Sequence, residues 1–131
     1  MLILDKNVDD DQRIALRSHH LRVAKVGLDV AKKGMSDPDL IRFLKTLHQP
    51  TFATRDLRLY RQTFCHPRYC LAVFDVDKSG LAGIALRFLR HPDFSTRRKR
   101  VGRVVHAGQA GIRAWSFASQ VEKFIPCSGP R

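Results

Sequence analysis

The chain has 131 residues and a mass of 15.0 kDa, the size of one domain able to bury roughly two thirds of its unfolded surface. Its 44% hydrophobic and 27% charged residues are ordinary for a globular protein, so the composition excludes a disordered chain and a fibrous repeat. The 24 Lys and Arg against 12 Asp and Glu give a formal net charge of +12, which favours a polyanionic partner: RNA, DNA or an anionic membrane surface.

The first half of the chain alternates between short apolar runs and helical patterns. Residues 2–4 predict a buried strand, residues 9–21 a helix that begins at three aspartates, and residues 22–26 a second strand. Residues 32–35 predict a loop, and Ser36 predicts the N-cap of the next helix. This order of elements favours strands joined by crossover helices.

The second half continues the pattern and then changes it. Strands are predicted at 51–54 and 70–74, an apolar helix at 79–90, a basic turn at 97–100, and two final strands at 101–105 and 112–117, joined as a hairpin. We therefore expect an α/β fold with a mostly parallel central sheet, helices on both faces and a C-terminal β-hairpin. Residues 1–118 would form one domain, and residues 119–131 a loose tail.

The surroundings of the protein are predicted from what the sequence lacks. No uncharged apolar run approaches the roughly 20 residues that a membrane span needs. Asp5 follows the N-terminus too early for a signal peptide. The three cysteines, Cys65, Cys70 and Cys127, are an odd number without the spacing of a disulfide framework. We therefore expect a cytoplasmic protein with no membrane partner.

Acidic residues stand where the predicted strands end. Asp5, Asp56 and Asp75 follow strands, and Asp37 opens a helix after another strand. In parallel sheets binding sites form at the carboxyl ends of the strands, so these acids can converge. Three carboxylates within about 4 Å of one another would repel by roughly 4 kcal/mol per pair at an effective dielectric of about 20, unless a proton or cation intervened. Oxygen ligands of this kind suit Mg²⁺ or Mn²⁺, which could activate water against a phosphodiester.

The basic charge is concentrated in residues 51–131, which carry fifteen Lys and Arg and five acids, a net of +10. Two segments of that region are candidates for phosphate contacts, one with spaced arginines and one with four consecutive cations. The predicted nucleic-acid contacts are Arg55, Arg58, Arg61, Arg97, Arg98, Lys99 and Arg100.

Three short motifs together are similar to a known family. L-D-K-N at 4–7, S-D-P-D-L at 36–40 and T-R-D at 54–56 resemble, in order and spacing, the motifs of a PIN-like family of small bacterial proteins over about the first 60 residues. The resemblance implies the three-layer PIN α/β/α sandwich and Mg²⁺- or Mn²⁺-dependent endoribonuclease activity, often as the toxin of a toxin–antitoxin pair.

The resemblance also implies roles for individual residues. Asp5, Asp37 and Asp56 would be the catalytic metal ligands, with Asn7 and Thr54 as polar support. Lys6 stands where the family usually has Glu, and Arg58 and Leu59 stand where it usually has a second Asp and Phe. Asp39 or Asp75 could supply the missing carboxylate.

Arg58 motivates a competing interpretation, in which the protein keeps the fold, has lost catalysis and binds nucleic acid or an antitoxin. Its basic face would then dock RNA or an acidic partner protein. DNA as the nucleic acid and a homodimer as the assembly stay open.

Overall fold

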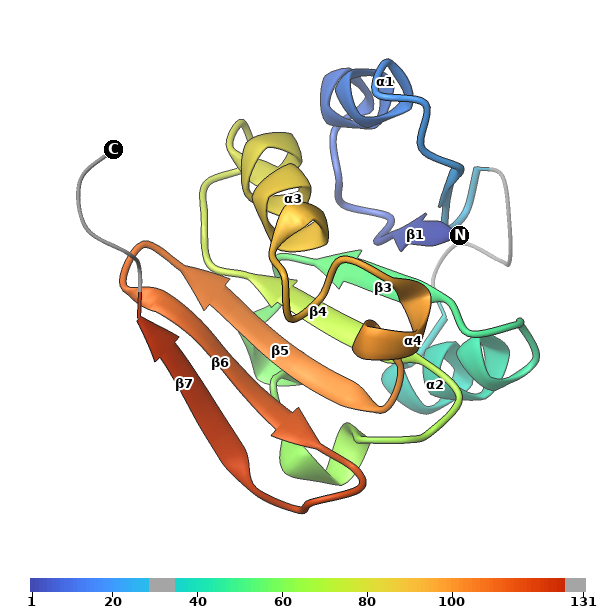
Figure 1. Ribbon diagram of the computed structural model, residues 1–131. Coiled ribbons are helices and arrows are strands. Elements are labelled where there is room, and N and C mark those ends of the chain that lie inside the picture. Colours follow the sequence, from blue (N-terminus) through green and yellow to red (C-terminus); the bar gives the residue numbers. More distant parts are fainter. Residues whose placement is uncertain (29–34, 127–131) are drawn as a thin grey trace.

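The computed structural model describes residues 1–28 and 35–126 of the chain as an α/β protein. Its seven-stranded mixed sheet has the order β2-β1-β3-β4-β5-β6-β7 (Figure 1). The strands are β1 (Leu2–Leu4), β2 (Val23–Lys25), β3 (Thr51–Thr54), β4 (Cys70–Phe74), β5 (Arg103–Gly108), β6 (Gly111–Ser116) and β7 (Glu122–Pro126). The helices are α1 (Asp10–Arg17), α2 (Asp37–Lys45), α3 (Leu81–Arg90) and α4 (Arg97–Arg100), with short 3-10 helices η1 (Leu57–Leu59) and η2 (Gln62–Phe64).

Strands β1 to β5 run parallel, and apolar side chains on both of their faces explain why they are buried. On one face Phe74 and Leu4 belong to a core shared with α1 and α3. On the other face Ile3 and Val73 pack in a second core with Leu44 of α2. Helices therefore cover both faces of the sheet, an arrangement compatible with a three-layer sandwich (Figure 1).

The antiparallel part of the sheet is larger than the sequence predicts. β6 pairs antiparallel with β5, and β7 pairs antiparallel with β6, so this part has three strands where two were expected. Residues 122–126, expected in the tail, form β7 because their backbone pairs with β6, although most of their side chains are exposed. Residues 32–34 of the loop predicted at 32–35, and Cys127, lie outside the described residues.

Local interactions set where the helices begin and end. The Ser36 hydroxyl accepts a hydrogen bond from the Asp39 N–H at 3.3 Å and so caps α2, as the sequence predicts. α1 ends at Arg17, four residues before the predicted apolar position Leu21. The buried Gln12 of α1 accepts a bond at Oε1 from the Ala82 N–H at 2.9 Å, which satisfies the first turn of α3 from a neighbouring helix.

The order in which strands are added to the sheet reverses between β1 and β3, which run parallel. The chain leaves β1 towards β2 through α1 and returns through α2 to β3 on the other side of β1. In open α/β sheets such a switch opens a crevice at the carboxyl ends of the two strands. Among the described residues, no helix is long and apolar enough to cross a membrane.

Candidate functional site

The two ends of the parallel sheet carry opposite charge. We use the term "carboxyl end" for the connections that follow strands β1 to β4. In the described part of the chain these are residues 5–11, 26–28, 35–39, 55–61 and 75–79. They hold nine of the twelve acids against five cations. The nine acids are Asp5, Asp9, Asp10, Asp11, Asp37, Asp39, Asp56, Asp75 and Asp77. The topology therefore places most of the acids at one end of the sheet.

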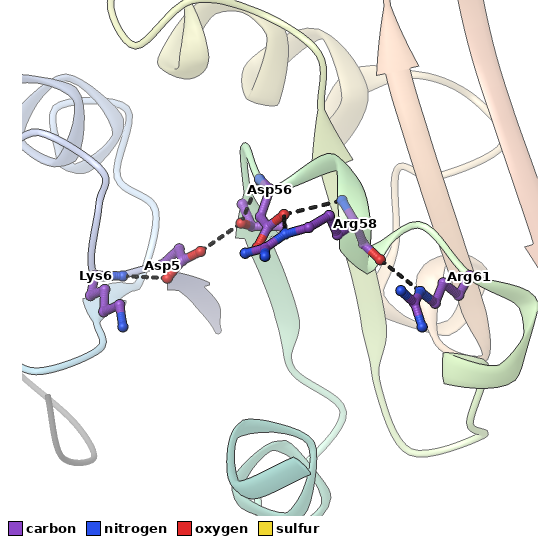
Figure 2. A network of polar contacts seen from close by, with 6 residues as sticks. Asp5, Lys6, Asp56, Arg58 and Arg61 are labelled. Atoms are coloured by element: carbon purple, nitrogen blue, oxygen red, sulfur yellow. Dashed lines mark hydrogen bonds and ion pairs between the residues drawn. The ribbon is translucent and has the colours of Figure 1, made fainter. Parts of the chain in front are cut away.

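At the carboxyl end, hydrogen bonds join the β1 and β3 strand ends (Figure 2). The buried Thr54 hydroxyl donates to Asp5 Oδ2 at 2.6 Å and accepts from the Asp56 N–H at 3.0 Å. The Lys6 N–H donates to the other Asp5 oxygen at 2.7 Å. The backbone of β1 and β3 adds a bond from the Asp5 N–H to the Ala53 carbonyl at 2.9 Å. Asp5, Thr54 and Asp56 thus form one connected group.

The Asp56 carboxylate is held by a guanidinium two residues along the chain. Arg58 Nε donates to Asp56 Oδ1 at 3.0 Å and Arg58 Nη2 to Oδ2 at 2.9 Å. Hydrogen bonding from Arg58 lowers the pKa of Asp56. In return Asp56 raises the pKa of Arg58, with a smaller contribution of the same sign from the charge of Asp37. The Arg58 side chain is 80% exposed, so this ion pair is open to water and salt.

The other predicted acids do not complete a metal centre with this pair. Asp37 is the first residue of α2 and is exposed, and Asp39 pairs with Arg42 at 2.7 Å. Asp75 Oδ2 lies 3.3 Å from His106 Nε2. Over the described residues, no group of three or more His, Cys, Asp or Glu side chains could hold a metal ion. The three-ligand centre predicted at Asp5, Asp37 and Asp56 is therefore not assembled in this structure, in which Arg58 occupies both Asp56 oxygens.

The predicted nucleic-acid contacts separate into two groups. Arg55, Arg58 and Arg61 lie at the carboxyl end, where Arg55 Nε donates to the Val76 carbonyl and Arg61 Nε to the Arg58 carbonyl. These three cations lie among the acids of that end, so the surface there has mixed charge. Asn7, predicted as polar support, is exposed in the turn after β1.

The second group, residues 97–100, lies at the opposite end of the sheet. We use the term "amino end" for the connections that lead into strands β2 to β5. These are residues 17–22, 45–50, 65–69 and 87–102. Asp93 is the one acid in these connections, against ten cations. The ten cations are Arg17, Arg22, Lys45, Arg68, Arg87, Arg90, Arg97, Arg98, Lys99 and Arg100. The amino end therefore carries most of the excess positive charge.

Sequence reasoning missed Arg22, Arg68 and the division between the two ends. The signal was present, because the segments that lead into predicted strands hold many cations and few acids, while the segments that leave them hold most of the acids. Cations in the last turns of helices are stabilised by the helix dipole, which accounts for Arg17, Arg87 and Arg90. It does not account for Arg22 and Arg68, which precede strands.

Comparisons of the chain with protein-family models, with curated proteins and with solved structures found no match. The PIN-like resemblance, the nuclease activity and the antitoxin partner therefore stay predictions from the three sequence motifs.

Proposed function

We propose that this protein binds RNA and that the amino end is its principal contact surface. The proposal rests on one observation: the connections that lead into the parallel strands hold ten cations and one acid. Phosphate contacts of Lys and Arg supply most of the affinity of such surfaces for nucleic acid. The carboxyl end has five cations among nine acids, so it would attract phosphates more weakly.

The choice of RNA rests on the PIN-like motifs in the first 60 residues, since phosphate contacts by themselves do not distinguish RNA from DNA. A single strand is the first ligand to test, because its backbone is more flexible than that of a duplex. Duplex DNA of the same sequence is therefore part of the test. Tighter binding of the duplex at every salt concentration would favour DNA as the ligand.

The test measures binding of a fluorescent single-stranded RNA by anisotropy over a series of salt concentrations. The amino-end triple variant R97Q/R98Q/K99Q and the carboxyl-end triple variant R55Q/R58Q/R61Q remove equal charge. If all three amino-end cations contact phosphates, the slope of log affinity against log salt falls by about 2 in that variant, from about 0.7 per contact. A larger decrease of this slope in the carboxyl-end variant than in the amino-end variant would contradict the proposal.

A second candidate function is metal-dependent RNA cleavage at the carboxyl end. The observation that favours it is the group formed by Asp5, Thr54 and Asp56 between adjacent parallel strands. Two carboxylates fit Mg²⁺ in part, because this ion often keeps several waters and takes its remaining ligands from substrate phosphates. Asp5 and Asp56 would hold the ion, which supplies a Lewis acid and an activated water. Thr54 would orient Asp5, and Arg58 would compete with the ion for Asp56.

RNA cleavage with Mg²⁺ or Mn²⁺ and calorimetric titration with Mn²⁺ test this second candidate. We expect D5N and D56N to lose both cleavage and Mn²⁺ binding, while the control D93N, at the other end of the sheet, keeps both. R58N should bind Mn²⁺ more tightly than the unmodified protein, because the competing guanidinium is gone. Undiminished cleavage by a folded D5N variant would exclude this assignment.

A further inference from the structure

A cavity opens at the amino end, where β1 and β3 begin beside the segment that joins α3 to α4. Its volume is about 230 Å³. Its lining includes Met1, Arg22, Thr51, Leu89, Ser95 and Arg100. Two of these residues are cations and two carry hydroxyl groups. The lining contains no acid and combines cationic, hydroxyl and apolar side chains.

Arg100 is the half-buried cation of this cavity. Its Nε donates to Thr51 Oγ1 at 3.0 Å and its Nη1 to the Phe94 carbonyl at 2.9 Å. Both acceptors are uncharged, and burial lowers the pKa of Arg100, with Arg97 acting in the same direction. None of the ion pairs found among the described residues involves Arg100. A partly desolvated guanidinium without an anion is unfavourable, and the two hydrogen bonds hold it in place.

Arg22 also lines the cavity, and the charge of Arg97 acts on Met1 beside it. Burial lowers the pKa of the amino group at Met1, and the charges of Arg97, Arg100 and Arg22 add to this effect in that order. All three guanidiniums therefore lie close enough to Met1, which lines the cavity, to act on it electrostatically. Arg22 precedes β2 and Arg97 opens α4, so the fold brings together cations that are 75 positions apart. Their mutual repulsion would be relieved by a bound anion.

We propose that this cavity binds a phosphate group. Guanidinium groups present planar, paired donors that match phosphate oxygens, and Arg100 is already fixed in one orientation. The volume is below the roughly 300–1,000 Å³ of pockets that enclose drug-sized ligands, so it suits a phosphate better than a whole nucleotide. The phosphate could belong to an RNA strand, in which case the inference rests on the proposed function, or to a small free phosphate.

Isothermal titration of the full-length protein with inorganic phosphate tests the site. The cavity variant R22Q/R97Q and the control R87Q/R98Q each remove two cations from the amino end, and only the first pair acts at the cavity. We expect phosphate to bind about tenfold or more weakly to the cavity variant and within about twofold of normal to the control. No phosphate binding to the unmodified protein, or equal weakening in both variants, would overturn the proposal.

Arg100 needs a milder change, because it also joins α4 to β3 through Thr51. R100K keeps the charge and loses the planar fork, so phosphate binding should weaken while the protein still folds. Unchanged phosphate affinity in R100K would argue against the proposed role of Arg100 and so against the site.

Two RNAs of one sequence, one with a 5′-phosphate and one with a 5′-hydroxyl, distinguish the sources of the phosphate. Tighter binding of the phosphorylated RNA, lost in R22Q/R97Q, identifies a strand end. Equal loss of both RNAs in R22Q/R97Q identifies a phosphate within the strand. Inorganic phosphate that binds without competing with RNA identifies a small free ligand, and this outcome supports the site even if the protein does not bind RNA.

Discussion

The two ends of the sheet differ in how they hold their charges. At the carboxyl end the Asp56 carboxylate accepts two bonds from Arg58, and Asp5 accepts from Thr54 and the Lys6 backbone, so charge is satisfied within the protein. At the amino end Arg100 is bonded to a hydroxyl and a carbonyl only. The comparison teaches that cations near a strand end are available to a partner only where acids do not already neutralise them.

β3 allows the two ends to be compared with matched variants. Thr51 begins this strand at the amino end and Thr54 ends it at the carboxyl end, and both side chains are buried. Each hydroxyl bonds a charged side chain, but Thr54 makes two hydrogen bonds and Thr51 accepts one from Arg100. The carboxyl end should therefore be the more sensitive to loss of a hydroxyl.

The largest expected effect on stability is that of Thr54→Val. The substitution keeps the shape of the side chain but removes the hydrogen-bond partner that Asp5 Oδ2 and the Asp56 N–H have in the described part of the chain. We expect the free energy of unfolding to fall by about 2–3 kcal/mol, measured by chemical denaturation. A loss smaller than that of Thr51→Val would show that the link between β1 and β3 is not an important one.

Gly102→Ala is expected to have the second-largest effect on the free energy of unfolding. Gly102 lies between α4 and β5 with a φ of 85°, a conformation that costs an L-residue about 1–2 kcal/mol, whereas an added Cβ would meet no atom closer than 4.0 Å. Strain alone should therefore lower the unfolding free energy by that amount. Gly83→Ala is the control, because this exposed position in α3 has open space around it and should stabilise by about 0.5–1 kcal/mol. Equal effects of the two changes would contradict the backbone explanation.

Thr51→Val is expected to cost less, about 1 kcal/mol. The Arg100 guanidinium loses one partner but keeps its bond to the Phe94 carbonyl and is partly open to water. The same denaturation experiment measures the change. Binding of inorganic phosphate to this variant should also weaken, because the orientation of Arg100 is less fixed.

The smallest expected effect is on the acid dependence of stability. Pairing with Arg58 lowers the pKa of Asp56 in the folded protein below its unfolded value of 3.8, so the folded state binds fewer protons there. The stabilisation is present above that pH and is lost as the pH falls through the folded pKa. Between about pH 6 and about pH 3, Arg58→Gln should therefore lose less stability than the unmodified protein. Identical acid dependence in both proteins would mean that the ion pair contributes nothing measurable.

Much of the fold could be predicted from local signals. Residues 70–74 are a continuous apolar run and residues 51–54 place Phe and Ala between two Thr, and the structure has both strands with the predicted bounds. α2 begins where Ser36 and its following acids predict. β7 was missed because it lies at the edge of the sheet, where exposed side chains leave no apolar pattern. Its formation depends on pairing with β6, which is a tertiary contact.

The candidate sites also have a part that the sequence could predict and a part that depends on tertiary contacts. Asp5 and Asp56 could be assigned to adjacent strand ends, because a parallel sheet brings all such ends together. That Arg58 would bind Asp56 follows from the 3-10 turn of η1, which folds the side chain back on its neighbour two positions earlier. The cavity at the amino end brings Arg22 and Arg100 into one lining, and no pattern in one segment could have indicated that proximity.

The separation of acids and cations along the strand direction gives the molecule a permanent electric dipole. A polyanion in solution would feel that field over about a Debye length, roughly 8 Å at physiological ionic strength. The protein would therefore turn its amino end towards the polyanion before contact, which raises the association rate and makes that rate fall steeply with added salt.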